Sequence, residues 1–189
     1  MCSRSDEQLI QDLAGGDEDA LRILVDRHTP SIYRFSVRYT GDESLAEDIA
    51  QEAFLRLYRS AGSFRRGNSF KTWLFAIVRN TSIDLARRYS YRKIHSLDQA
   101  DDLISDGIES RYLVDKSPGP EESRVSRETE ENVRKALSSL PERQRTAVIL
   151  KYFEGMRCKE IAEIMELSVS SVESLLVRAK RNLLKRLEI

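Results

Sequence analysis

Apolar residues recur three and four positions apart along nearly the whole chain, and this spacing constrains its fold more than any other feature. A period of about 3.6 residues places apolar side chains on one face of an α-helix. No stretch keeps the two-residue alternation of a half-buried strand. We therefore predict an all-α protein, in agreement with the abundant Leu, Ala, Arg and Glu and with only four Pro and eight Gly.

The helical spacing is interrupted between residues 95 and 124. That stretch holds eight acidic and three basic side chains, and it includes the helix-breaking run Pro118-Gly119-Pro120. Its charge and its few aromatic residues favour a flexible linker over an ordered loop packed on one domain. The predicted organisation is two small helical domains, residues 1–95 and 123–189, joined by a flexible acidic linker over residues 96–122.

Residues suited to helix ends mark several boundaries. Ser5 and Gln8 have the spacing of a capping box, and Asp17 is suited to begin a second helix. Helical spacing lies on both sides of Pro30 and ends at Gly41. Further helices are expected at about residues 44–59 and 70–93, separated by a turn-rich loop. The second of these ends in a strongly basic half, which has five bases and one acid between residues 79 and 93.

The composition excludes several classes of protein. Cys2 and Cys158 cannot form a disulfide framework, and without a Cys/His cluster we expect no metal site. No apolar run approaches the ~20 residues needed to span a bilayer, which predicts a cytoplasmic protein without membrane insertion. We find no phosphate loop or nucleophile motif, so we expect no catalytic residues and no cofactor. Three classes of protein remain as alternative interpretations of this helical chain: a DNA-binding response regulator, an enzyme with a basic helical tail, and a structural helical adaptor.

Residues 159–187 have the spacing of a helix-turn-helix, with helices expected at 159–165 and 169–187. Ser168 is suited to cap the second helix. Glu166 stands where Gly is usual in this turn, which implies a left-handed residue or a different turn. The second helix ends strongly basic, and such a helix can lie in the major groove of DNA. DNA binding is the prediction, and a plain helical hairpin with a basic solvated face is the alternative.

Four segments together resemble the extracytoplasmic-function (group IV) sigma factors of bacterial RNA polymerase, in the sigma-70 family. They are residues 6–28, 46–59, 70–88 and 140–183, and they occur in the family's order. The resemblance implies a non-enzymatic initiation factor that joins core RNA polymerase, directs it to specific promoters and promotes DNA melting. It also implies that residues 1–95 are sigma domain 2, that residues 123–189 are sigma domain 4, and that an anti-sigma factor is a regulatory partner.

The resemblance assigns contacts to three surfaces. Polymerase docking falls on Asp48, Gln51, Glu52, Phe54, Leu55 and Tyr58, although Phe54 is also suited to the core. Recognition of the minus-ten element and strand capture fall on Phe64, Arg65, Arg66, Lys71, Arg79, Asn80, Arg87 and Arg88. Contact with the minus-thirty-five element falls on Ser170, Ser171, Glu173, Ser174 and Arg178, with phosphate contacts from Arg178, Lys180 and Arg181.

Several residues keep alternatives at this stage. Glu173 could accept a hydrogen bond from a cytosine amino group or close a capping box with Ser170. Trp73 is the sole tryptophan, and its apolar neighbours favour a core position over base stacking. His28 is expected at the edge of the core, without a partner for metal or triad chemistry. Cys158 is expected to be a small packing residue near a helix start.

Overall fold

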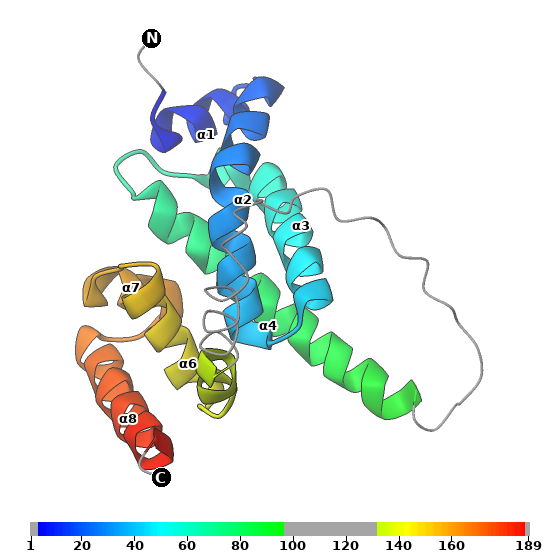
Figure 1. Ribbon diagram of the computed structural model, residues 1–189. Helices are drawn as coiled ribbons and strands as arrows, with labels where there is room; N and C mark the ends of the chain where they lie inside the picture. The colour runs from blue at the N-terminus through cyan, green and yellow to red at the C-terminus, as the bar shows by residue number, and fades with distance from the viewer. Residues whose placement is uncertain (1–3, 97–131, 188–189) are drawn as a thin grey trace, which may run out of the picture.

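The computed structural model describes residues 4–96 and 132–187, and every regular element in these ranges is a helix. This confirms the predicted all-α class. Apart from Ser96, the predicted linker lies outside the described residues. The helices form two groups, an N-terminal domain at the top of Figure 1 and a C-terminal domain at its lower left.

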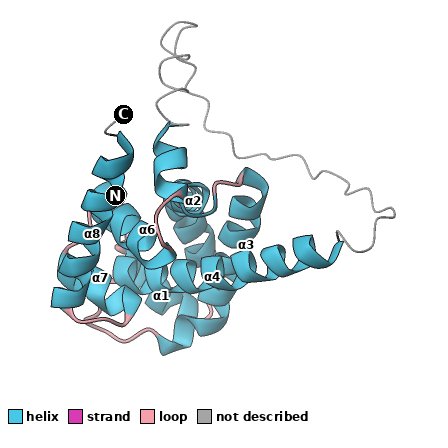
Figure 2. Cartoon of the chain, turned by 90° about the horizontal axis from the view of Figure 1, so that it is seen from below, coloured by secondary structure: helices cyan, strands magenta, loops and turns pink. Residues whose placement is uncertain are grey.

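The N-terminal domain contains α1 (Asp6–Ala14), α2 (Glu18–Thr40), α3 (Glu43–Ser60), a 3₁₀ turn η1 (Ala61–Ser63) and α4 (Phe70–Ser96). Helices α2 and α3 lie side by side, and α4 packs against both of them. The C-terminal end of α4 projects beyond its neighbours in both views (Figures 1 and 2). The basic half of this helix is therefore divided, because Thr81 and Ser82 are fully buried whereas residues 87–92 are exposed.

The helix starts follow the predicted caps. Ser5 and Gln8 form the capping box of α1, and Asp17 accepts a hydrogen bond from the backbone N–H of Asp19 at the start of α2. Gly41 ends α2 with a φ of 76°, a left-handed conformation that costs Gly little.

Pro30 lies inside the second helix and does not divide it. Helix α2 continues through it for 23 residues, even though proline removes one intrahelical hydrogen bond. On the C-terminal side of Pro30, Ile32 and Phe35 are fully buried. Burial of this apolar face offsets the local cost, which is about 3 kcal/mol for an interior proline.

The C-terminal domain begins with helical residues 132–138 and continues through α6 (Glu142–Val148) into a π-helical turn, η2 (Ile149–Phe153). Gly155 follows η2 with a φ of 69°. The last two helices are α7 (Cys158–Met165) and α8 (Val169–Leu187), with the predicted bounds to within one residue. Ile149, Leu150 and Val172 are fully buried between these elements.

Candidate nucleic-acid interface

Helices α7 and α8 form the predicted helix-turn-helix. Glu166 ends α7 with φ 54° and ψ 47°, and it is the one non-glycine residue with a positive φ in the part of the chain that the structure describes. Ser168 then caps α8, because its Oγ accepts a hydrogen bond from the Ser171 N–H at 3.2 Å. The Ser168 cap was predicted from the sequence, and of the two alternatives left for Glu166 the structure has the left-handed residue and not a different turn.

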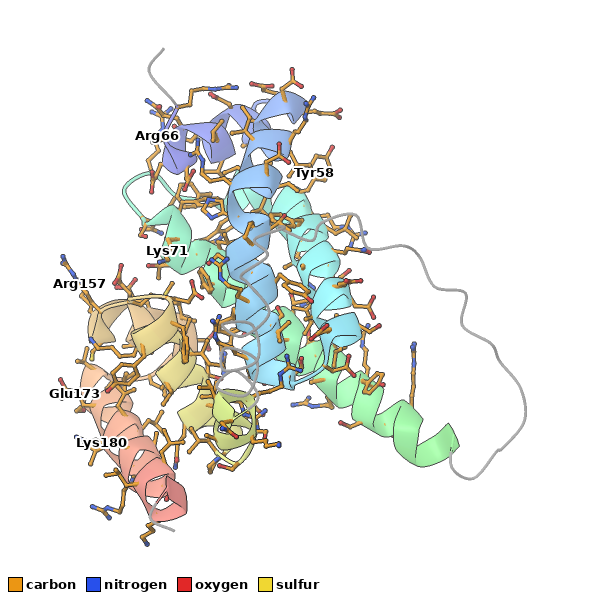
Figure 3. The ribbon with its side chains drawn as sticks, in the orientation of Figure 1. Tyr58, Arg66, Lys71, Arg157, Glu173 and Lys180 are labelled. Carbon is orange, nitrogen blue, oxygen red and sulfur yellow. The ribbon has the colours of Figure 1, made fainter. Side chains whose placement is uncertain are left out.

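The face of α8 turned away from α7 carries the residues assigned to the minus-thirty-five element. We call this set the candidate α8 surface: Ser170, Ser171, Glu173, Ser174, Arg178, Lys180 and Arg181, all exposed. Val172 and Ala179 are fully buried on the opposite face and hold the helix in place. Leu175 packs against the core. Figure 3 shows Glu173 and Lys180 along the outer side of α8.

The capping alternative for Glu173 is wrong. Ser170 is the second residue of α8, and the N-cap position is held by Ser168. A capping box needs its Ser at the N-cap and its Glu three residues later, so Glu173 lies two residues too far into the helix. The contact of Glu173 with a base stays a prediction.

The loop before α4 divides the residues assigned to strand capture. Arg65 and Arg66 are exposed, whereas the Phe64 ring packs edge-on against Trp73 and Phe70, with centroids 5.4 and 6.2 Å away. Phe70 itself is fully buried. The core position predicted for Trp73 is confirmed, and Phe64 belongs to the same aromatic cluster.

The remaining assigned residues follow α4. Together with those of the loop they form the candidate α4 surface: Phe64, Arg65, Arg66, Lys71, Arg79, Asn80, Arg87 and Arg88. Asn80, Arg87 and Arg88 are exposed, whereas Arg79 is half-buried and donates to the Asn80 Oδ1 at 3.0 Å. The Lys71 ammonium is already engaged, because it donates to the backbone oxygen of Glu154 at 2.6 Å.

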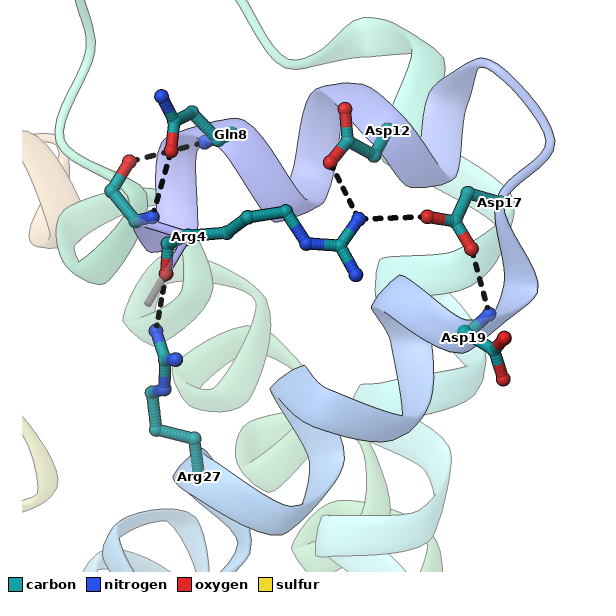
Figure 4. A network of polar contacts seen from close by, with 7 residues as sticks. Arg4, Gln8, Asp12, Asp17, Asp19 and Arg27 are labelled. Carbon is teal, nitrogen blue, oxygen red and sulfur yellow. Dashed lines mark hydrogen bonds and ion pairs between the residues drawn. The ribbon is translucent and has the colours of Figure 1, made fainter. Parts of the chain in front are cut away.

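Helix α1 supports the start of α4 from a distance in sequence. The Glu7 carboxylate accepts a hydrogen bond from the Phe70 N–H at 3.2 Å. Close by, Asp6 pairs with Arg27 and lies 2.9 Å from the His28 Nε2. Arg4 spans the outside of this corner by pairing with Asp12 and Asp17 (Figure 4).

His28 sits at the core edge as predicted, but it does have a partner. Its ring lies 5.2 Å from that of Phe70, and Asp6 faces its Nε2. Burial lowers the pKa of His28 below its ordinary value, although the Asp6 carboxylate works in the opposite direction. Asp6 and His28 are 22 positions apart in the sequence, so no local pattern indicates that they pair.

The residues assigned to polymerase docking lie on α3, where we call Asp48, Gln51, Glu52, Phe54, Leu55 and Tyr58 the candidate α3 surface. Leu55 and Tyr58 are 50% and 48% exposed, while Phe54 packs partly against the core. Glu52 pairs with Arg56 at 2.9 Å, and Arg56 also reaches Asp84 on α4. In Figure 3, Tyr58 lies on the other side of the molecule from Arg66 and Lys71.

Sequence reasoning missed residues that join the two domains. Arg145 donates to the backbone oxygen of Tyr39 at 2.6 Å, and the Ser31 hydroxyl donates to the Glu154 carboxylate at 2.7 Å. More than 100 positions separate the partners in each pair, so no local motif could have indicated them.

In the described ranges, no group of three or more His, Cys, Asp or Glu side chains is placed to hold a metal ion.

The two domains match two conserved regions of one protein family. Residues 24–92 match sigma-70 region 2, and residues 130–183 match sigma-70 region 4. The RNA polymerase sigma-H factor of Pseudomonas aeruginosa is 32% identical over 188 residues, which cover 100% of this chain and 96% of that protein. The chain belongs to the sigma-70 family of RNA polymerase sigma factors.

Two further relatives place it among the ECF sigma factors. The ECF sigma factor SigW of Bacillus subtilis is 33% identical over 179 residues, covering 94% of each chain. The ECF sigma-E factor of Escherichia coli is 32% identical over 178 residues, covering 93% of this chain and 91% of that protein. This sigma factor is therefore a promoter-specific transcription initiation factor and not an enzyme.

Solved structures share the fold. CnrH, in a complex with the cytosolic domain of CnrY, is 23% identical, with a TM-score of 0.71 over 97% of both chains. The sigma factor RpoE of Bartonella quintana, in a complex with the anti-sigma factor NepR, is 22% identical, with a TM-score of 0.62. That alignment covers 91% of this chain and 96% of RpoE.

None of the described helices combines the length and the apolar character that crossing a bilayer demands.

Proposed function

We propose that this sigma factor docks on core RNA polymerase through the candidate α3 surface. Its exposed Leu55 and Tyr58 flank polar residues, a combination typical of the centre and rim of a protein interface. Because these side chains stand on the side of the molecule away from Arg66 and Lys71, polymerase and DNA would not compete for one face.

The candidate α4 surface would recognise the minus-ten element and hold a separated strand. Exposed Arg65, Arg66, Arg87 and Arg88 supply positive charge along the loop and the helix, and Asn80 presents an amide. Positive groups follow a strand's phosphates, while an amide can pair with a base edge. Phe64 would have to leave its packing on Trp73 to stack on a base.

The candidate α8 surface would contact the minus-thirty-five element in the major groove. All its members are exposed on one capped helix, which is the single observation that best supports DNA binding by this chain. Arg178, Lys180 and Arg181 would bind phosphates and set the position of the helix on the duplex. Glu173 would accept from a cytosine amino group.

The proposed setting is the cytoplasm, where polymerase and promoters meet. An anti-sigma factor is the proposed regulator, and the complexes of CnrH with CnrY and of RpoE with NepR support this proposal. The boundaries at residues 95 and 123 are proposed for the two sigma domains, and both family matches fall inside them.

Run-off transcription with purified core polymerase on a promoter library tests the whole proposal. The wild-type chain should select a subset of promoters. Replacement of Leu55 and Tyr58 by Ser should weaken polymerase binding, whereas Ile23→Ser, an exposed apolar residue on α2, should not. Arg79→Ala and Asn80→Ala should impair duplex opening more than polymerase binding, and permanganate footprinting on duplex and premelted promoters measures the opening. Equal defects on both templates would argue against a melting role.

A further inference from the structure

The loop between η1 and α4, residues 64–69, has little packing of its own, and we call it the strand-capture loop. Residues 65–69 are all exposed, both loop arginines included. A backbone hydrogen bond from the Asn68 N–H to the Arg65 carbonyl at 3.2 Å closes a turn, in which Gly67 has a φ of 92°. An exposed loop of this kind takes its position from whatever holds its two ends.

Helix α1 packs against both ends of the strand-capture loop. It contacts η1, which comes directly before the loop, and α4, which begins directly after it. Ala61 of η1 and Phe70 of α4 are buried in the same core as Leu9 and Ile10 of α1. In Figure 1 the loop lies just below α1 on its way from η1 to α4. The loop is therefore anchored at each end by the same helix.

Glu7 of α1 completes the cap of α4. The first N–H groups of a helix have no intrahelical acceptor. At the start of α4, the Ser69 hydroxyl accepts from the Thr72 N–H at 3.3 Å, and the Glu7 carboxylate accepts from the Phe70 N–H at 3.2 Å. A carboxylate at this place is also favoured by the positive end of the helix dipole. Phe70, the first residue after the loop, is thus tied to a side chain 63 positions earlier in the sequence.

A second set of contacts fixes the direction in which α1 presents Glu7. The neighbouring Asp6 carboxylate pairs with Arg27 of α2 and lies 2.9 Å from the Nε2 of His28. The ring of His28 in turn lies 5.2 Å from the ring of Phe70, measured between centroids. Asp6 and Glu7 therefore hold α1, α2 and the start of α4 in one arrangement.

A displacement of Phe70 would reach both ends of the strand-capture loop. The Phe70 ring packs edge-on against Phe64, the first residue of the loop, at 6.2 Å between centroids, and Phe64 packs against Trp73 at 5.4 Å. The match to sigma-70 region 2 covers residues 24–92, so α1 lies before the match although it holds a loop inside it. Region 2 alone therefore does not contain every contact that sets the position of the loop.

We propose that α1 positions the strand-capture loop for promoter melting, with Glu7 as the positioning residue. This inference rests on the proposed function of the candidate α4 surface. A strand is captured faster when the charges that meet it already stand in place, because side chains that must first be ordered add to the barrier. By holding the Phe70 N–H, Glu7 keeps the loop and its two arginines at a set position relative to α4. Glu7 acts in this way without touching DNA.

Two substitutions of Glu7 in the full-length chain test the proposal. Glu7→Ala removes the acceptor, whereas Glu7→Gln keeps a side-chain oxygen that accepts from the Phe70 N–H. Glu18→Ala is the matched control, because Glu18 is an exposed acid in the first turn of α2, as Glu7 is an acid in the first turn of α1.

Three quantities are measured for each variant. The rate of duplex opening comes from a time course of permanganate footprinting with core polymerase, on a promoter that the wild-type chain selects in run-off transcription. The affinity for core polymerase reports whether the N-terminal domain keeps its fold. Acrylamide quenching of Trp73, the sole tryptophan, reports in the free sigma factor how firmly the aromatic cluster beside the loop is packed.

Glu7→Ala should slow duplex opening about tenfold and increase the quenching of Trp73, because the start of α4 loses its tie to α1. Its polymerase affinity should stay at the wild-type value, since Tyr58 of the candidate α3 surface lies on the other side of the molecule from Arg66. Glu7→Gln should restore opening to within about twofold of wild type. Glu18→Ala should change none of the three quantities.

Wild-type opening by Glu7→Ala, an equal loss of polymerase affinity, or unchanged quenching of Trp73 would each overturn the positioning role. Opening by Glu7→Gln that is as slow as with Glu7→Ala would also overturn it, because the hydrogen bond would then not be the cause. A variant that combines Arg65→Ala with Arg66→Ala tests the loop itself. Normal opening by this variant would contradict the proposed function of the candidate α4 surface, whereas slow opening beside normal opening by Glu7→Ala would overturn the role of α1 alone.

Discussion

The candidate α8 and α4 surfaces, both proposed to bind DNA, are built differently. Every assigned residue of α8 is exposed on one 19-residue helix, whose start is capped by Ser168 after Glu166 ends α7. The α4 set is divided, since Phe64 packs in an aromatic cluster and Lys71 is bonded to Glu154.

This difference fits the two forms of DNA that the surfaces are proposed to bind. A duplex presents its groove edges without being opened, so a rigid protruding helix is sufficient to contact it. A captured base must be unstacked and taken into a site, which requires side chains that can change partners. Phe64, which packs on Phe70 and Trp73 in an aromatic cluster, is a side chain of this kind, and it lies next to the exposed arginines of the loop.

The largest expected effect is a loss of stability from a substitution in the aromatic cluster beside the candidate α4 surface. Phe70→Ala removes a fully buried ring that contacts Phe64, Trp73 and His28, and it should cost about 3–5 kcal/mol of stability. Urea unfolding followed by the fluorescence of Trp73 measures the loss. Tyr89→Ala, on the exposed part of α4, is the matched aromatic control and should change stability little. A comparable loss of duplex binding by α8 would contradict the separation of the two surfaces.

Substitutions on α8 sharpen the same comparison on the DNA side. Arg178→Ala should weaken binding to all duplexes and reduce the salt slope by about one, because a phosphate contact carries no sequence information. Glu173→Lys should instead change preference between sequences by about 1–3 kcal/mol at one base pair. Titrations on several promoters at two salt concentrations separate the two effects. A uniform effect of Glu173→Lys across promoters would remove its assignment to a base.

The turn of the helix-turn-helix should tolerate one stabilising change. Glu166→Gly relieves a left-handed residue with a φ of 54° and should raise stability by about 1 kcal/mol. Glu163→Gly, three residues earlier inside α7, should lower stability by a similar amount, since glycine weakens a helix interior. Thermal unfolding of both variants provides the measurement. Destabilisation by Glu166→Gly would show that its side chain does more than fill the turn.

The smallest expected effect concerns pH and lies on the α4 side. Burial lowers the pKa of His28 in the folded protein below its ordinary value of 6.5, so the unfolded chain binds the proton more readily. The corresponding stability is fully present above pH 6.5 and is lost as the pH falls through the folded pKa. His28→Gln should flatten this part of the stability profile. Urea midpoints between pH 5 and 8, compared with wild type, would reveal an unaltered slope if His28 is not responsible.

The sequence by itself determined the local structure of this sigma factor. Helical spacing predicted the all-α class, and the caps at Ser5, Asp17 and Ser168 follow from side chains that bond to a backbone only two or three residues away. The bounds of the helix-turn-helix were predictable for the same reason, while the choice between a left-handed Glu166 and a different turn came from the structure. The exposure of the candidate α8 surface could also be expected from helical spacing, because all of its residues lie on one helix.

Only the tertiary structure decided what depends on partners far apart in the chain. Glu7 reaches Phe70, Asp6 faces His28, and Arg145 binds the carbonyl of Tyr39, across separations of 63, 22 and 106 residues. Pro30 stays inside a helix because buried neighbours compensate for it, which the local pattern cannot express. Contacts of this kind arise when packed helices bring side chains together, so their pairing depends on helix packing, which the spacing of residues along one helix does not specify.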